Sequence, residues 1–346
     1  MDKIVSYEQI QNMENHIRSL KRGFVTNFYW DNRKHPYWLS DSSLYYDAKP
    51  DCFLLIHQSE DFLNIYYIAV SINAFLRHSA EIEFEKDVVL DVITKEENLA
   101  LISEFLSYGY EMYKHLFRMI HVGPMIVEEN EINDSVISAN MNDIVAISNA
   151  LYQCFDPLAE QLPSNMELSD HISNDEIILI MDKDTICGFI IFEIVGVTWY
   201  LRYWYTSPDY RNLGIGAKLL KASLIKGKNT KRQILWVMSN NENAIKRYEH
   251  YGFKRELLND YILIKRKHNM KEKIVSILSD LRPEFDFTEE GVNFIEDGML
   301  DSFDMVSVVD ELEEQFGIKI DGIDVVADNF TTVANIEALL KKSGAK

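Results

Sequence analysis

The chain has 346 residues, 47% of them apolar, and a formal net charge of −20. This length suits two or three globular domains, and so acidic a balance argues against a nucleic-acid-binding protein. We expect a cytoplasmic protein without a membrane span, because no apolar stretch reaches about 18 residues and residues 1–22 lack the apolar core of a secretory signal. Cys52, Cys154 and Cys187 are widely spaced and form no CxxC pair, which indicates reduced thiols and no metal site.

The first third of the chain alternates between helical and extended patterns. Residues 5–22 are predicted to be helical, with Ile10, Met13, Ile17 and Leu20 on one face and Gly23 after them. The further expected elements are strands over 24–29, 52–57, 64–70 and 88–93, a helix over 96–108 and an extended segment over 110–120.

The middle of the chain follows a similar order after a charged connection at 128–134. Residues 141–143 are predicted to cap a helix that contains Ile144, Ile147 and Leu151. Strands are expected over 177–181, 186–194, 200–205 and 234–238.

An internal repeat links these two parts. Residues 89–94 resemble 234–239, and residues 105–110 resemble 248–253, with a shift of only two residues between the pairs. Each copy keeps the order strand, helix, glycine, aromatic residue. We therefore expect two copies of one α/β unit, over about 20–125 and 135–267.

A glycine-spaced loop follows the strand at 200–205. Ser207-Pro208-Asp209 ends the strand, and Gly214 and Gly216 open a helix. Free backbone N–H groups at such a helix start favour a phosphate or pyrophosphate, although a tight strand-to-helix turn explains the glycines equally well. The first copy offers only the glycine-free stretch 71–76 at this place.

Two motifs together resemble the GNAT acyltransferase superfamily: Arg211-x-x-Gly214-x-Gly216, and Asn241-x-x-Ala244 followed by Tyr248 and Gly252-Phe253. The resemblance covers 135–267 well and 20–125 weakly. It implies a mixed sheet in which two neighbouring strands part and hold the pantetheine of coenzyme A or an acyl-CoA. The binding residues that it implies are Tyr205, Thr206, Arg211, Asn212, Leu213, Gly214, Ile215, Gly216, Ala217 and Asn241.

The same resemblance suggests catalytic roles. Tyr248 occupies the position at which this family often places a tyrosine near the sulfur, so it is the candidate general acid. Glu193 is the best candidate for the general base if the family layout holds. Asn241 either bonds the pantetheine or caps its own helix, and the sequence does not separate these roles.

The last part of the chain, 270–346, is more acidic, with seven Lys or Arg against eighteen Asp or Glu. A helix through Ile274 and Leu278 is expected to end at Pro283. A second helix is expected to bury a stripe made of Val306, Val309, Leu312 and Phe316, and Thr331 or Thr332 is expected to cap a last helix.

This part resembles an acyl or peptidyl carrier protein. Leu300-Asp301-Ser302-Phe303 and the stretch 312–317 particularly resemble the D-alanyl and peptidyl carrier type. The resemblance implies a four-helix bundle with 4′-phosphopantetheine on Ser302, attached by a phosphopantetheinyl transferase. The alternative is that Ser302 simply caps a helix.

Together these patterns predict an α+β protein with tandem GNAT-like splayed sheets and an all-α four-helix carrier bundle. The expected domains are a degenerate GNAT-like copy over 1–125, a GNAT acyltransferase over 126–267 and a carrier protein over 268–346. The expected function is transfer of an acyl group from acyl-CoA or a carrier to an amine, such as an amino acid held on the chain's own carrier. Alternatives are a transferase that loads the carrier thiol from CoA and a non-catalytic carrier scaffold. An adenylating enzyme or synthase is the expected further partner.

Overall fold

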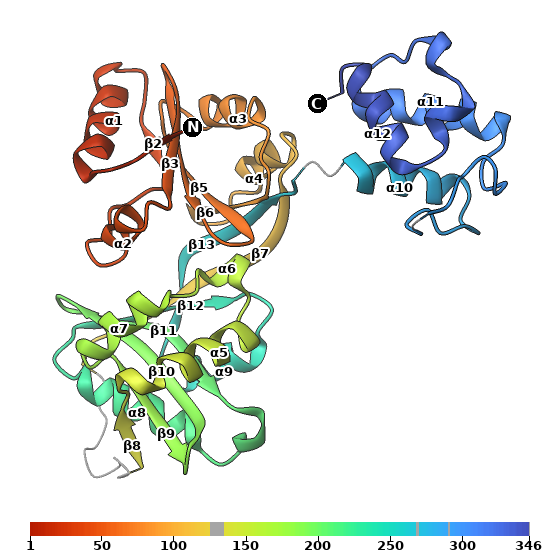
Figure 1. Ribbon diagram of the computed structural model, residues 1–346. Helices are drawn as coiled ribbons and strands as arrows, with labels where there is room; N and C mark the ends of the chain where they lie inside the picture. The colour runs from red at the N-terminus through yellow and green to blue at the C-terminus, as the bar shows by residue number, and fades with distance from the viewer. Residues whose placement is uncertain (125–134, 268–269, 290, 346) are drawn as a thin grey trace. The chain divides into compact units, whose positions relative to one another are not determined.

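The computed structural model describes residues 1–124, 135–267, 270–289 and 291–345, which form two units (Figure 1). The larger unit comprises Met1–Ile82 and Lys86–Lys265, and the carboxyl-terminal unit comprises Glu83–Glu85 and Arg266–Lys346. The predicted connection at 128–134 lies outside the described residues, as do the predicted domain starts at 126 and 268.

The first half of the larger unit begins with a well-capped helix. The elements of this half are β1 (Asp2–Lys3), α1 (Tyr7–Ser19), β2 (Val25–Thr26), α2 (His35–Ser40), β3 (Leu44–Lys49), β4 (Cys52–Gln58), β5 (Phe62–Ala69), α3 (Ile72–Ala80), β6 (Asp87–Lys95), α4 (Leu99–Leu106) and β7 (Glu111–Val122). Ser6 and Gln9 form a capping box at the start of α1. As predicted, α1 buries Ile10, Met13 and Ile17. The strand expected over 24–29 is only the two-residue β2.

The second half repeats this order. Its elements are β8 (Val136–Ser138), η2 (Met141–Asp143), α5 (Ile144–Cys154), α6 (Pro157–Glu160), α7 (Asn165–Ser173), β9 (Ile177–Asp182), β10 (Thr185–Val195), β11 (Thr198–Thr206), η3 (Pro208–Tyr210), α8 (Ile215–Lys226), β12 (Arg232–Met238), α9 (Glu242–His250) and β13 (Lys254–Lys265). Residues 141–143, predicted as a cap, are a 3-10 turn that Asn140 caps. The repeat between the halves is visible in the matching series β6, α4, β7 and β12, α9, β13.

The two halves share one sheet, which corrects the expectation of two separate sheets. Its order is β1-β3-β4-β5-β6-β13-β7-β12-β11-β10-β9-β8. Strand β13 of the second half lies between β6 and β7, and β7 of the first half lies between β13 and β12 (Figure 1). The β7–β13 pair is antiparallel, with Leu116 opposite Asp260. Each half therefore completes its sheet with a strand of the other.

A parallel strand pair parts in each half. Strands β11 and β12 pair only over Thr198–Tyr200 and Arg232–Ile234, although β11 continues to Thr206. Strands β5 and β6 likewise pair only over Phe62–Asn64. These two gaps are the splayed positions that the resemblance implied.

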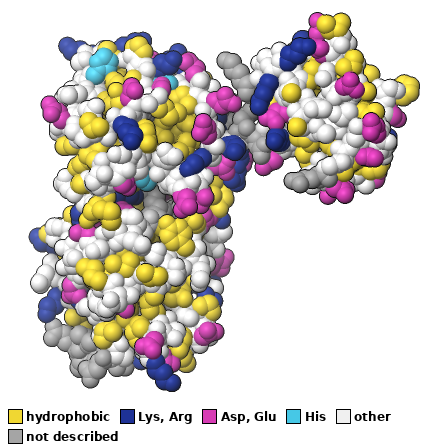
Figure 2. All heavy atoms as spheres, viewed as in Figure 1, with side chains coloured by type: hydrophobic (Ala, Val, Ile, Leu, Met, Phe, Trp, Pro, Cys, Tyr) yellow, Lys and Arg dark blue, Asp and Glu magenta, His cyan; other side chains and the backbone are white. Residues whose placement is uncertain are grey.

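The described part of the carboxyl-terminal unit contains three α-helices and two 3-10 turns instead of four α-helices. They are α10 (Met270–Leu281), α11 (Ser302–Phe316), η4 (Gly322–Asp324), η5 (Ala327–Phe330) and α12 (Val333–Lys342). Thr332 caps α12, one of the two predicted candidates. Figure 2 shows acidic side chains spread over the visible face of this unit.

The predicted buried stripe of α11 is partly wrong. Val306 is 57% exposed, and the buried residues are Met305, Val308 and Leu312. The cause is a rotation of about 100° per residue, which places position 306 to one side of the 305–308–312 row. Val309 and Phe316 lie at the edge of this core.

Two further sequence expectations concern membranes and metals. Across the described ranges, no helix is both long and apolar enough to cross a membrane. Nor do the residues described here include three or more His, Cys, Asp or Glu grouped to hold a metal ion. Cys52, Cys154 and Cys187 are free, and Cys154 is exposed.

The shared sheet predicts that a first-half substitution destabilises the second half. Met119 of β7 is fully buried in the core cluster that contains Trp199 and Leu235. Met119→Ala leaves a cavity there and should lower the free energy of unfolding by about 2–5 kcal/mol. Met112→Ala is the control, because Met112 lies on the same strand and is 55% exposed. Urea unfolding measures both, and equal stability of the two variants would contradict the shared core.

Candidate active site

The glycine loop connects the free end of β11 to α8. Asn212 and Gly214 have positive φ values of 65° and 75°, so the chain turns twice before the helix begins. A Cβ atom on Gly216 would lie 3.2 Å from both the Trp204 ring and the Thr206 hydroxyl. Gly214 therefore serves the turn, and Gly216 serves close packing against β11.

The start of α8 presents unused backbone donors. No side chain caps this helix, and its first helical bond runs from the Lys218 N–H to the Gly214 carbonyl. Within the described residues, the N–H groups from 212 to 217 have no hydrogen-bond acceptor. Arg211, Asn212, Leu213 and Gly214 are exposed beside them. Such an array at the positive end of a helix dipole suits an anion.

Two residues of α9 take different positions. The Asn241 side-chain oxygen accepts a hydrogen bond of 3.1 Å from the Ala244 N–H and so caps α9. Tyr248 is 8% exposed, and its ring lies 5.7 Å from that of Trp204 at the splayed end of β11. Burial raises the pKa of the Tyr248 hydroxyl, and the nearby Glu160 carboxylate adds to the rise.

The corresponding gap of the first half is filled by its own chain. β4 occupies one edge of β5 as far as Ala69, so β2 pairs on the other edge, toward β6. The Asn27 side chain then bridges the gap: it accepts from the Tyr67 N–H at 2.8 Å and donates to the carbonyls of Ile65 (3.4 Å) and Asp91 (3.2 Å).

The helix start beside that gap is closed as well. Only two residues separate β5 from α3, and the Ser71 side chain accepts the Ala74 N–H. In the part of the chain that the structure describes, the start of α3 thus leaves fewer N–H groups without an acceptor, those of 71–73, than the start of α8 does, where they extend from 212 to 217.

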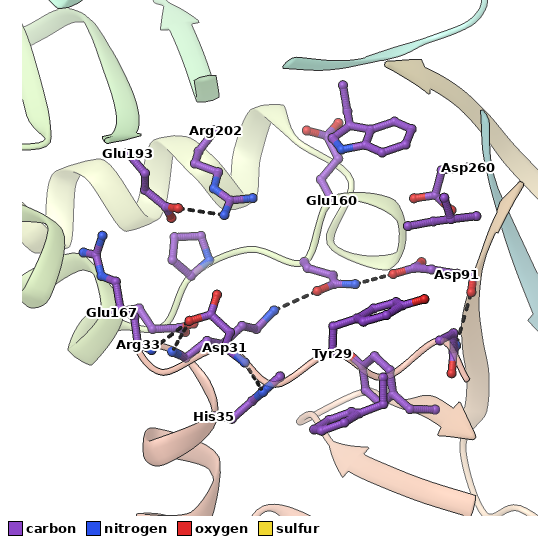
Figure 3. A pocket seen from close by; sticks show the side chains of 18 of the residues that line it. Tyr29, Asp31, Arg33, His35, Asp91, Glu160, Glu167, Glu193, Arg202 and Asp260 are labelled. Atoms are coloured by element: carbon purple, nitrogen blue, oxygen red, sulfur yellow. Dashed lines mark hydrogen bonds and ion pairs between the residues drawn. The ribbon is translucent and has the colours of Figure 1, made fainter. Parts of the chain in front are cut away.

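A cavity of about 510 Å³ lies between the two halves of the larger unit. Tyr29 and Asp91 line it from the first half, and Glu160 and Arg202 line it from the second (Figure 3). Lys34 of the first half and Trp236 of the second also line it. Arg202 belongs to β11 and Trp236 to β12, so the cavity adjoins both strands of the second-half gap. Arg202 is also the extra residue of a β-bulge, since Ile191 pairs with Tyr203 and Phe192 with Leu201.

An ion-pair cluster joins the halves at one side of the cavity. Arg33 of the first half binds Asp170 at 2.6 Å and Glu176 at 2.8 Å, both in the second half. Asp31 holds Arg33 in place by accepting its backbone N–H at 2.7 Å. Because each carboxylate receives more than one bond from the guanidinium, this contact fixes the halves in one register.

Glu193, the predicted base, lies in this cavity but is already paired. Arg202 donates to its carboxylate at 2.7 Å, and the His171 Nε2 lies 3.8 Å away. In Figure 3 its side chain meets that of Arg202.

Glu160, which the sequence did not single out, lies at the end of α6. Tyr203 donates to its backbone carbonyl at 2.8 Å and holds it in place. Burial, together with the Asp156 charge, raises the pKa of the Glu160 carboxyl to about 7. A carboxyl that titrates near neutral pH beside Tyr248 is suited to proton transfer.

Asp91 and Asp260 were also missed, although each interrupts an apolar strand. The sequences Val88-Val89-Leu90-Asp91 and Asp260-Tyr261-Ile262-Leu263 contained that signal. Burial raises the pKa of the Asp91 carboxyl to about 6 and that of Asp260 well above its usual range.

Ser302, in the carboxyl-terminal unit, is the first residue of α11. Asp301, not Ser302, caps this helix by accepting the N–H groups of Phe303 and Asp304. The Ser302 side chain is exposed. Phe303 next to it is 84% exposed.

Comparisons with known proteins bear on the second half and on the fold. Residues 144–253 match the model of the acetyltransferase (GNAT) family. None of the curated proteins that were compared matches the sequence. A solved tandem GNAT protein from the clavulanic acid biosynthesis pathway, without acetyl-CoA, aligns with a TM-score of 0.51 at 8% identity, over 77% of this chain and 98% of that chain.

Two further solved structures have lower scores. A GNAT-family acetyltransferase from Colwellia psychrerythraea has a TM-score of 0.47 at 14% identity, over 77% of this chain and 99% of that chain. A GCN5-related N-acetyltransferase from Sphaerobacter thermophilus has a TM-score of 0.46 at 14% identity, over 67% and 85%. At 8% identity the likeness to the tandem protein concerns the fold alone. Residues 144–253 are thus similar to the acetyltransferase (GNAT) family, and this similarity supports assignment of the protein to the transferase enzymes.

Proposed function

We propose that the protein transfers an acyl group from acyl-CoA to an amine bound in the cavity between its two halves. The observation that carries this proposal is the continuity of three features in the second half: the unused N–H groups at 212–217, the gap between β11 and β12, and the cavity that adjoins both strands. The loop takes the pyrophosphate, the gap takes the pantetheine, and the thioester reaches the cavity. Arg211 lies beside the loop and supplies a positive charge.

Glu160 and Tyr248 divide the proton transfers in this proposal. The amine nitrogen attacks the thioester carbon and forms the C–N bond, and its proton passes to the Glu160 carboxylate. Backbone N–H groups of β11 between Leu201 and Thr206, where β12 no longer pairs, stabilise the oxyanion. The C–S bond then breaks, and the thiolate takes a proton from the Tyr248 hydroxyl. We prefer Glu160 to Glu193 as the base because Arg202 already neutralises Glu193.

We further propose that the carboxyl-terminal unit carries 4′-phosphopantetheine on Ser302 and holds an amino acid as the acceptor. Since Asp301 caps α11, the Ser302 hydroxyl is not needed as the helix cap and is exposed for modification. Free CoA is the donor in this scheme, because its pyrophosphate uses several N–H groups of the loop and a carrier arm brings a single phosphate. A tether raises the concentration of the arm near its partner to about millimolar.

The first prediction from the proposed function concerns the loop. Gly214→Val forces a β-branched residue into φ 75°, so acyl-CoA affinity should fall at least about 100-fold. The fold should persist, because nothing lies within 4 Å of the new Cβ. Gly196→Val is the matched control, since Gly196 has φ 58° and equal free space in the β10–β11 turn. Calorimetry should show one site per chain in the unsubstituted protein, and unchanged affinity in Gly214→Val would remove the loop from the proposal.

The second prediction concerns the base. Glu160→Gln should lower kcat by about 10²- to 10⁴-fold. Since the base works only when ionised, kcat/KM of the unsubstituted enzyme should rise with pH up to about 7 and then level off. The rise of kcat/KM with pH should disappear in Glu160→Gln. Ionisation of the amine substrate, by contrast, affects both enzymes alike. Glu193→Gln, the comparison variant, should lose less than about tenfold, and the reverse ranking would make Glu193 the base.

The third prediction concerns the carrier. Incubation with CoA and a phosphopantetheinyl transferase should add one phosphopantetheine mass to the full chain. Ser302→Ala should prevent this addition, because it removes the attacking hydroxyl. Ser307→Ala is the control, since Ser307 is also exposed on α11 and bonds only the Phe303 carbonyl at 3.3 Å. Intact-protein mass spectrometry reads the result, and a mass gain in Ser302→Ala would refute the assignment.

A further inference from the structure

Two carboxylates in the cavity have no part in the proposed proton transfers. Asp91 on β6 and Asp260 on β13 lie on neighbouring antiparallel strands, where Asp91 pairs with Ile262 and Asp260 with Ile93. Diagonal positions of this kind face the same side of a sheet. Both line the cavity, on the side away from Glu193 and Arg202 in the view of Figure 3.

The buried Asp260 carboxyl group has an oxygen, Oδ1, without a hydrogen-bond partner among the described residues. An oxygen that is buried without a hydrogen bond loses its hydration and gains nothing in return, and this cost is larger when the group is charged. Asp91 differs, since its carboxylate accepts a hydrogen bond from the Gln161 side-chain amide.

The cations of the cavity are engaged elsewhere. Arg33 binds Asp170 and Glu176, and Arg202 binds Glu193. Lys34 donates to the Gln161 side-chain oxygen at 2.7 Å rather than to either aspartate. Carboxylates outnumber Lys and Arg among the lining residues by seven to three. Among the described residues no salt bridge to Asp91 or Asp260 is formed, although the Lys34 charge, connected to Asp91 through Gln161, partly offsets the rise that burial causes in the pKa of Asp91.

We propose that the Asp91–Asp260 pair binds a second, cationic group of the acceptor, so that the acceptor is a diamine or a basic amino acid. This inference rests on the proposed function: one amino group lies at Glu160 and is acylated, and the other lies at the aspartates. An ammonium group has three donors, enough to satisfy Asp260 Oδ1 and to bond Asp91. It also stabilises the ionised form of the pair, which burial alone disfavours.

Two sources supply this chemistry, a free diamine and a basic aminoacyl group on the phosphopantetheine arm. The first part of the experiment measures acetyl transfer from acetyl-CoA to 1,4-diaminobutane and to butylamine. The second uses lysyl-pantetheine and norleucyl-pantetheine thioesters as acceptors, which differ only in the side-chain amino group. We expect the dicationic member of at least one pair to be preferred at least about tenfold in kcat/KM.

Asp260→Asn tests the residue itself. It should raise KM for the preferred dicationic acceptor by about 10- to 100-fold and leave kcat and the KM of its monoamine partner nearly unchanged. Asp91→Asn should act in the same direction and guards against misfolding of one variant. Equal losses for both acceptors, or no dication preference in the unsubstituted enzyme in either pair, would overturn the inference.

An equilibrium measurement separates this inference from the proposed function. Calorimetry of 1,4-diaminobutane and of lysyl-pantetheine with the full chain should show binding that both Asp→Asn variants weaken. If this binding is found but no amine releases CoA, the cationic site stands and the acyl-transfer proposal fails. If CoA is released but neither variant changes binding or KM, acyl transfer stands and the dication site fails.

Discussion

The pairing of β7 with β13 is the constraint on which the larger unit depends. Each strand is the last strand of its own half in sequence but completes the sheet of the other half. Leu116 of β7 pairs with Asp260 of β13 in this antiparallel ladder. Because the two sheets are continuous, the halves cannot slide or rotate without breaking ladder hydrogen bonds. Arg33 adds a second fixed contact through Asp170 and Glu176. A cavity lined by both halves therefore has walls of fixed spacing, as orientation of an acceptor against a thioester requires.

The two copies of the repeat differ at the gap between their parallel strands and at the start of the helix that follows. In the second half, the eight residues between β11 and α8 leave backbone donors unused and a gap open between β11 and β12. In the first half, β2 and Asn27 fill the equivalent gap, and Ser71 caps the equivalent helix. Buried backbone groups need partners, and in the first half the chain itself supplies them at this gap. The first half forms part of the cavity lining, to which it contributes Lys34 and Asp91.

The loop, the repeat and most strands were predictable from local patterns in the sequence, because glycine spacing and apolar periodicity act over a few residues. The exchange of β7 and β13 was not predictable from them, since either pairing buries the same apolar faces. Glu160 was missed for a related reason: the largest cause of its raised pKa is burial, which depends on the tertiary fold, and the charge of the nearby Asp156 only adds to it. Val306 shows the limit within one helix, where a one-residue error in phase exchanges an exposed position for a buried one.

In the proposed reaction, the negative net charge of the chain acts in opposite ways on the acyl-CoA donor and on the amine acceptor. The chain carries a formal net charge of −20, so its overall field attracts a cationic amine and opposes the approach of anionic CoA. In the proposed reaction, donor binding must then rely on short-range contacts, for which the N–H groups at 212–217 are available. Acceptor binding gains from the field at longer range, and the unpaired Asp260 oxygen gives it a specific end point. The acidic composition is thus consistent with the proposed enzyme, in which backbone N–H groups bind the donor and charge selects the acceptor.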